Sequence, residues 1–392
     1  MLNNIKFLCR MYWPVVVITA VLLLAYCLLI LIYRHWYLGL PLFKIDKALQ
    51  PQTKFSVIIP ARNEEDNIRN CLQSILQQNY PSGLFDVIVI NDHSTDQTES
   101  IIRSMQQEYG NLHLLNLTDY LDGKQLNAYK KKAIEIAISQ STGAWIVTTD
   151  ADCMVSDQWL TLYDAFIQEK QPVFVAAPVM FTDEHSFLST FQLLDFISLQ
   201  GITAAAVSAG HHTMCNGANI AYRKDAFYEV GQFKGIDDLA SGDDMLLMHK
   251  MKQKYPDGLG YLFSRGAIVT TAPMPDWKSF FNQRIRWASK ADKYKDKSIF
   301  WVLALVYAVN ALLLVLLVWG LFVENGIYNW LVLVIAKTII ELSLMIPVAK
   351  FYGHVEILLW FPLMQPFHML YTVIAGWLGK FGTYQWKGRK VH

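Results

Sequence analysis

The stretch FSVIIPARNEE, residues 55–65, decides the fold of this chain. Its first part, residues 55–61, is mostly apolar and β-branched and ends beside Pro60, which predicts a short buried strand. The polar stretch that follows, residues 64–78, carries apolar side chains at the spacing of an amphipathic helix. A strand that leads directly into a helix is the first unit of an α/β fold.

The same alternation continues along the first half of the chain. Strands are predicted over residues 86–91, 112–117 and 144–149, and helices over residues 96–109 and 125–140. Buried strands that alternate with amphipathic helices are typical of a mostly parallel, Rossmann-like sheet with helices on both faces. We therefore predict the α/β class and expect ligands at the carboxyl ends of the strands.

Apolar stretches outside this sheet, residues 12–33, 299–323 and 330–349, predict membrane-spanning helices. Each reaches the ~20 residues that a helix needs to cross the hydrocarbon core of a bilayer. A fourth stretch, residues 355–377, is interrupted by prolines. It either crosses fully or, in the interpretation that we prefer, lies in the interface or turns back.

Charged residues orient these spans. A basic flank marks the cytoplasmic side of a membrane, so we expect the segment between the first two spans to be cytoplasmic. Within the third span, Lys337 and Glu341 lie four residues apart, which predicts an ion pair inside the helix bundle. The flanking basic residues are Arg34, Lys44, Lys47, Lys54, Lys290, Lys293, Lys295 and Lys297.

Asp150 and Asp152 follow the predicted strand at residues 144–149. An Asp-x-Asp triplet occurs about once by chance in a chain like this, so its position carries the information. Two carboxylates at a strand end repel unless a cation lies between them, and oxygen ligands favour Mg²⁺ or Mn²⁺ bound jointly with a diphosphate. Upstream, Lys131 and Lys132 either contact those phosphates or form a solvated helix face.

Two further acidic positions are candidates. Asp92 ends the second predicted strand and caps no obvious helix, which favours a ligand role. Asp243 and Asp244 follow Gly242 and precede a predicted helix. They either form an acidic first helical turn or supply a general base that takes a proton from a sugar hydroxyl.

Residues 276–290 place aromatic and other apolar residues on one face of a predicted helix, which is typical of a helix in the membrane interface. Arg286 would give a bidentate contact with a diphosphate, and Trp287 would give a flat stacking surface for a sugar ring. Membrane anchoring alone is the alternative function of this segment.

Taken in order, these motifs resemble those of family 2 glycosyltransferases. They are SVIIPARNEE at 56–65, NDHSTD at 91–96, TDAD at 149–152, GDD at 242–244 and QRIRW at 283–287. The last is similar to a motif of membrane synthases of cellulose, hyaluronan and chitin. The resemblance implies a GT-A fold, a UDP-sugar donor, a divalent metal and inversion at the anomeric carbon.

The resemblance also implies roles for single residues. It gives the catalytic base as Asp244, with Asp243 as the alternative, and the metal ligands as Asp152 and Asp150. Donor binding would involve Pro60, Arg62, Glu64, Asp92, Lys132 and Asp150, and the diphosphate and acceptor would meet Asn216, Gly217, Asn219, Gln283, Arg284, Arg286 and Trp287.

We therefore expect a membrane-bound inverting glycosyltransferase that moves a sugar from a nucleotide-diphosphate sugar to a lipid or glycan hydroxyl at the cytoplasmic face of the cell membrane. A processive polysaccharide synthase and a catalytically silent nucleotide-sugar-binding subunit are the alternatives. The net charge of +1 gives no reason to expect nucleic acid. The expected parts are a membrane helix at 1–36, the GT-A domain at 50–275, an interfacial helix at 276–296 and a membrane region at 298–380.

Overall fold

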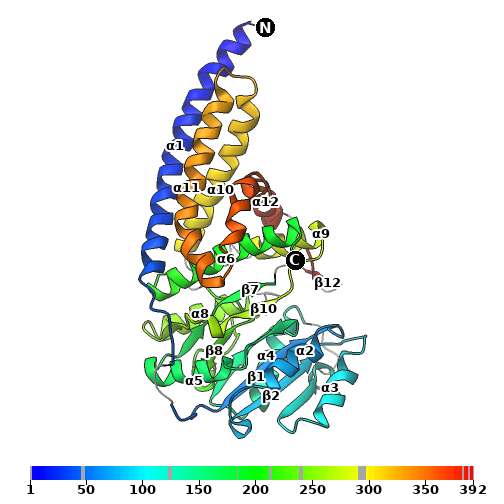
Figure 1. Ribbon diagram of the computed structural model, residues 1–392. Coiled ribbons are helices and arrows are strands. Elements are labelled where there is room, and N and C mark those ends of the chain that lie inside the picture. Colours follow the sequence, from blue (N-terminus) through cyan, green and yellow to red (C-terminus); the bar gives the residue numbers. More distant parts are fainter. Residues whose placement is uncertain are drawn as a thin grey trace.

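Figure 1 shows a sheet-based part and a long helical bundle that rises from it. The computed structural model describes residues 2–45, 49–121, 126–182, 184–211, 214–237, 242–289, 297–381, 384–386 and 389–391. Of the basic residues expected beside the spans, Lys47, Lys290, Lys293 and Lys295 lie outside the described residues.

A seven-stranded sheet forms the centre of the first part. Its strand β1 (Phe55–Ala61) pairs in parallel with β2 (Phe85–Asn91) and β4 (Trp145–Thr148). Every residue of β1 except Pro60 is buried, as expected of a strand covered on both faces. The strand order is β3-β2-β1-β4-β8-β6-β9, with β3 at Leu112–Asn116, β8 at Ile220–Arg223, β6 at Phe174–Ala176 and β9 at Leu259–Tyr261.

The sheet is mixed because β8 runs antiparallel to both of its neighbours, β4 and β6, whereas the other pairings are parallel. The predicted α/β class with a mostly parallel sheet is confirmed, although the antiparallel strand was not predicted. A small second sheet joins β5 (Cys153–Met154), β10 (Val269–Thr271) and β7 (Val179–Phe181).

Helices cover the main sheet as the apolar spacing predicted. The helix expected near residue 125 begins at Tyr129, and the one expected near residue 96 begins at Thr98. The helices of this part are α2 (Ile68–Leu76), α3 (Thr98–Gln106), α4 (Tyr129–Gln140), α5 (Trp159–Lys170), α7 (Lys224–Glu229), α8 (Asp243–Lys254) and α9 (Trp277–Ala288).

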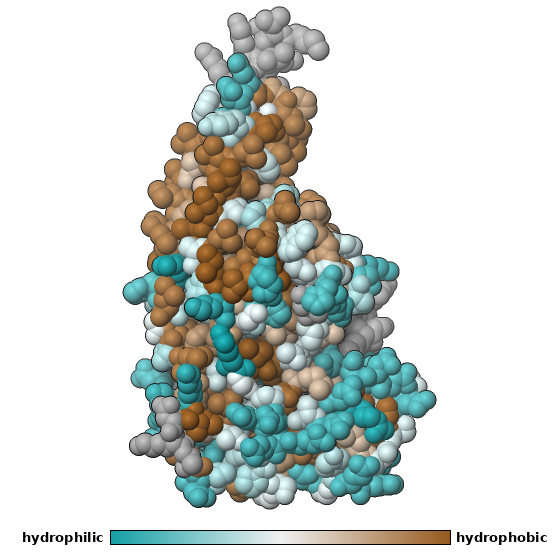
Figure 2. Space-filling view, in the orientation of Figure 1, coloured by the Kyte–Doolittle hydropathy of each residue, from teal (hydrophilic) through white to brown (hydrophobic). Residues whose placement is uncertain are grey.

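Five helical segments among the described residues are long and apolar enough to cross a membrane, judged by length and composition. Apolar side chains gather over the bundle, whereas hydrophilic ones gather over the far end of the sheet-based part (Figure 2). The segments belong to α1 (Leu2–Leu38), α6 (Phe187–Ser208), α10 (Lys297–Gly320), α11 (Gly326–Tyr352) and α12 (Phe361–Phe381) with the short helix before it.

Helix α6 was not predicted, and it lies between the sheet and the bundle (Figure 1). Most of its side chains are buried inside the protein, which accounts for its apolar composition. It approaches α11 closely, because a Cβ atom added at Gly201 would lie 2.4 Å from Cγ2 of Val348. Helix α6 therefore forms the packing layer between the sheet and the bundle.

Polar side chains inside the bundle join three of its helices. The Nζ atom of Lys337 lies 2.6 Å from Oε1 of Glu341, so the predicted ion pair is confirmed. Tyr26 of α1 donates a hydrogen bond to Glu341, and Gln365 of α12 bonds to both members of the pair. Helix α12 also packs against α9 and α10 beside the lower part of the bundle (Figure 1). Its membrane placement stays a prediction.

Candidate active site

The sequence-predicted residues converge on one cavity of about 460 Å³ at the carboxyl ends of β1, β2 and β4. This is the edge of a parallel sheet where ligands of α/β proteins bind. The predicted residues that line it are Pro60, Arg62, Glu64, Asp92, Asp150, Asp152, Asn216, Gly217, Asp243, Asp244, Gln283, Arg286 and Trp287. Lys132, Asn219 and Arg284 do not line it.

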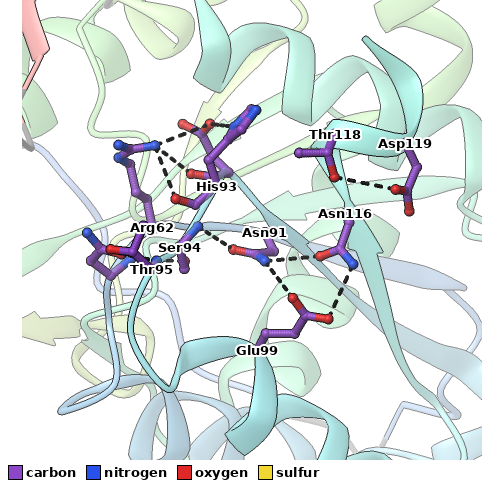
Figure 3. A network of polar contacts seen from close by, with 11 residues as sticks. Arg62, Asn91, His93, Ser94, Thr95, Glu99, Asn116, Thr118 and Asp119 are labelled. Atoms are coloured by element: carbon purple, nitrogen blue, oxygen red, sulfur yellow. Dashed lines mark hydrogen bonds and ion pairs between the residues drawn. The ribbon is translucent and has the colours of Figure 1, made fainter. Parts of the chain in front are cut away.

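The loops after β1 and β2 form one edge of the cavity, where Arg62, Glu64 and Asp92 line it. Figure 3 shows the polar contacts that join these loops. Arg62 donates a hydrogen bond of 2.8 Å to the backbone carbonyl of Asp92, and its Nη1 lies 3.9 Å from the Asp92 carboxylate. Oδ1 of Asp92 also lies 2.8 Å from Nδ1 of His93. Because the Asp92 side chain is buried, these contacts fix where its remaining acceptor sites face.

A second polar network stabilises this edge from behind (Figure 3). Asn91 at the end of β2 donates to both Glu99 and Asn116, and its Oδ1 accepts the backbone N–H of Ser94 at 3.0 Å. The network connects the ends of β2 and β3 with the first turn of α3. The loop that carries Asp92 is therefore held in place by side chains as well as by backbone.

Lys130, which was not predicted as a site residue, joins the two acidic motifs. Its Nζ atom lies 2.8 Å from Oδ1 of Asp150 and 3.4 Å from Oδ2 of Asp243. Burial alone would lower the pKa of Lys130, but the nearby carboxylates of Asp150, Asp243 and Asp244 raise it well above its usual value. The group is therefore a fixed cation in the cavity at neutral pH.

The neighbouring lysines of α4 have other contacts, which corrects the expectation for Lys132. Lys131 is buried and donates to the carbonyl of Ile236, whereas Lys132 is partly exposed and pairs with Glu135 at 3.4 Å. Successive residues of a helix point about 100° apart, so only one of three consecutive lysines reaches the cavity.

Asp244 is fixed at the start of α8. Its Oδ2 accepts the backbone N–H of Gly217 at 2.9 Å, and its Oδ1 accepts that of Met245 at 2.7 Å. Each carboxylate oxygen has a second lone pair for a ligand. Asp244 can thus hold the start of α8 in place and still offer its carboxylate to a ligand.

Asn219 does not face the cavity, which corrects its expected contact with the acceptor. Its Oδ1 accepts hydrogen bonds from Trp159 and Tyr163, and its Nδ2 donates to the carbonyls of Pro178 and Ala267. An Asn side chain has two donors and two acceptor sites, and here all are used inside the protein. Asn219 therefore holds the fold together behind Asn216 and Gly217.

Helix α9 presents its motif in two directions. Gln283, Arg286 and Trp287 line the cavity. Arg284 instead points into the protein, where its Nη2 lies 2.7 Å from Oδ2 of Asp195 on α6. Arg284 therefore does not face this cavity, which corrects its expected contact with the diphosphate: the guanidinium is buried against Trp287 and ties α9 to α6.

Asp150 and Asp152 offer carboxylate oxygens to the same cavity, which fits a divalent cation of the Mg²⁺ or Mn²⁺ type. Within the described part of the chain, no group of three or more His, Cys, Asp and Glu residues could hold a metal ion. A cation here would therefore complete its shell with oxygens of a bound ligand and with water.

The model of glycosyl transferase family 2 matches residues 56–231, and that of glycosyl transferase family group 2 matches residues 145–378. Similar proteins include the glycosyltransferase AglE of Haloferax volcanii, 29% identical over 213 residues, and the probable glycosyltransferase YdaM of Bacillus subtilis, 26% identical over 251 residues.

These matches are partial. The alignment with the Haloferax volcanii protein covers 54% of this chain and 65% of the relative, and that with the Bacillus subtilis protein covers 60% and 54%. A beta-monoglucosyldiacylglycerol synthase of a Nostoc species is 31% identical over 127 residues, which is 32% of this chain and 26% of the relative. The chain thus spans less than two thirds of the length of each of these relatives.

Among solved structures, the fold is similar to that of a mannosyltransferase from Pyrobaculum calidifontis, determined in complex with GDP-Man and Mn²⁺. The TM-score is 0.60 and the identity 18%, and the alignment covers 95% of this chain and 98% of that one. The alignment therefore includes both the sheet-based part and the helical bundle.

Proposed function

The chain belongs to glycosyltransferase family 2, and from that premise we propose that it transfers a sugar from a nucleotide-diphosphate sugar, a UDP-sugar, to a hydroxyl group of a lipid or glycan, with inversion at the anomeric carbon. One observation carries the proposal. Asp150 and Asp152 lie on the same cavity as Asp243 and Asp244, with Lys130 between the two pairs.

The proposed reaction is an in-line displacement. The acceptor oxygen bonds to the anomeric carbon as the bond from that carbon to the diphosphate breaks, and the acceptor proton moves to a carboxylate oxygen of Asp244. Asp150 and Asp152 would hold a divalent cation, which neutralises charge on the diphosphate when it is bound. Arg286 would bind the leaving diphosphate, and Trp287 would stack against the sugar.

Replacing Lys130 with Ala is expected to lower kcat/KM for the donor about 10- to 100-fold. The substitution removes a hydrogen bond from a charged group to the donor phosphates, and such a bond contributes roughly 1.5–3 kcal/mol. Lys132→Ala is the matched control on the same helix, and its effect should stay within about twofold, as for other exposed pairs. Donor titrations of both variants measure this. Equal effects of the two substitutions would place the phosphates elsewhere.

We also propose that the protein is integral to the cell membrane, with the catalytic cavity on the cytoplasmic side. The support is the apolar composition of the bundle together with Arg34, Lys44, Lys54 and Lys297, which flank the first two spans on the side of the sheet. A cytoplasmic cavity has direct access to nucleotide sugars.

The proposal is tested with membranes that contain the protein, Mg²⁺ or Mn²⁺, and a panel of radiolabelled nucleotide sugars. We expect label from a UDP-sugar to enter a product, and EDTA to stop the transfer. Lipid extraction and gel analysis then separate a single added sugar from a polymer. Purified protein that neither transfers nor hydrolyses any donor in the panel would contradict the proposal and favour a silent binding subunit.

A further inference from the structure

A second cavity, of about 1070 Å³, lies on the bundle side of Trp287. Residues of α1, α6, α9, α10, α11 and α12 line it, and most of the lining is apolar, with Leu194, Ile202, Val306, Leu344 and Met364 as examples. Its volume is at the upper end of the range found for pockets that enclose small molecules.

The two cavities meet at Trp287, which lines both. Gly242 and Met245 line the second cavity, and they are the chain neighbours of Asp243 and Asp244, which line the first. A molecule in the second cavity therefore lies beside the residues that carry the proposed base.

The second cavity is bordered by exposed apolar side chains between α10 and α12. Phe300 and Leu303 of α10 are 39% and 41% exposed, and Trp377 and Phe381 of α12 are 60% and 67% exposed, and all four line the cavity. This border belongs to helices that are apolar enough for a membrane. Lipid is the environment in which such exposed aromatic and aliphatic groups are stable.

The charged groups on the wall are Asp195, Glu341, Arg284 and Lys380. Asp195 pairs with Arg284, and Glu341 pairs with Lys337 behind the wall. A negative headgroup beside either pair would compete for its cation, whereas an uncharged headgroup would not.

We propose that this cavity holds the acyl chains of the acceptor, an uncharged lipid with a hydroxyl in its headgroup, of the diacylglycerol type. The hydroxyl passes Trp287 to reach Asp244. The inference rests on the proposed function, since a general base serves a hydroxyl acceptor, whereas a lipid phosphate is already ionised and needs no base.

The experiment uses the full chain in phosphatidylcholine vesicles with dioleoylglycerol that carries a photoreactive diazirine in one acyl chain. We expect light-induced labelling of peptides from α10 and α12 without any donor present. Ala304→Trp fills the cavity, and Leu303→Trp fills its border. Each should reduce labelling and raise KM for dioleoylglycerol about tenfold, the scale on which pocket volume discriminates between ligands.

Val318→Trp is the matched control, because Val318 lies on α10, is 61% exposed and does not line the cavity. It should leave labelling and transfer unchanged, and thermal melts show that each variant folds. Labelling that is absent from α10 and α12, or unaffected by both filling variants, overturns the inference. So does transfer to undecaprenyl phosphate in place of dioleoylglycerol.

The proposed function and the lipid site are tested by separate measurements. Hydrolysis of a nucleotide sugar by the wild-type chain, measured without lipid, supports that function whatever the labelling shows. Labelling of the cavity in a chain that turns over no donor would establish the lipid site and reject the glycosyltransfer that we assign to it.

Discussion

Asp244→Asn is expected to lower the rate of sugar transfer by about 10²- to 10⁴-fold, the usual contribution of a general base. The amide cannot accept the acceptor proton, and it retains only one of the two oxygens that bond to Gly217 and Met245. Donor binding should persist, because Asp244 is not among the groups that we assign to the nucleotide or metal. Transfer rates and the donor dissociation constant measure the two effects.

Asp243→Asn is the comparison that assigns the base. It removes the negative charge from the second ion-pair partner of Lys130, while the carboxylate of Asp244 stays in place. We expect a smaller loss of transfer than in Asp244→Asn. If Asp244→Asn still transfers sugar at the wild-type rate and Asp243→Asn does not, Asp243 is the base and our assignment is wrong.

Asp195→Asn is expected to cost about 3–5 kcal/mol of stability, because it leaves the Arg284 guanidinium buried without its ion partner. Transfer should fall as well, since α9 carries Gln283, Arg286 and Trp287 into the cavity. Asp195 touches neither the donor nor the reacting atoms in this scheme and acts as a positioning residue. Thermal melts in detergent, followed by donor kinetics below the transition, separate the two losses.

Two further variants check the reason for this loss. Arg284→Met in the Asp195→Asn background removes the unpaired charge and should restore part of the stability. Glu169→Gln breaks the exposed ion pair with Lys170 and should cost less than about 1 kcal/mol. Similar costs for Asp195→Asn and Glu169→Gln would show that burial does not matter here.

The location of the site could be predicted because parallel strands bring their carboxyl ends to one edge. Asp92 and Asp150 are far apart in the sequence, yet each follows a buried strand, and both line the cavity. The direction of single side chains could not be predicted in the same way. Arg284 and Arg286 are two positions apart on α9, so they point about 200° away from each other, and only Arg286 lines the cavity.

Lys130 and α6 show a second limit of sequence reasoning. No motif in the sequence marks Lys130, and only the fold reveals that it reaches Asp150 and Asp243. Helix α6 has no alternation of apolar and polar faces, because protein surrounds it on most sides. Its existence depends on tertiary packing, which a local pattern does not record.

The near contact of Gly201 with Val348 has a practical consequence. Truncating the chain between α9 and α10 would remove α11 from its contact with α6 and expose a large apolar surface of α6 to water. We expect the truncated protein to aggregate for this reason. The sheet-based part is thus not expected to stay soluble in aqueous buffer without the bundle. Its enzymology belongs in detergent micelles or nanodiscs, with every helix retained.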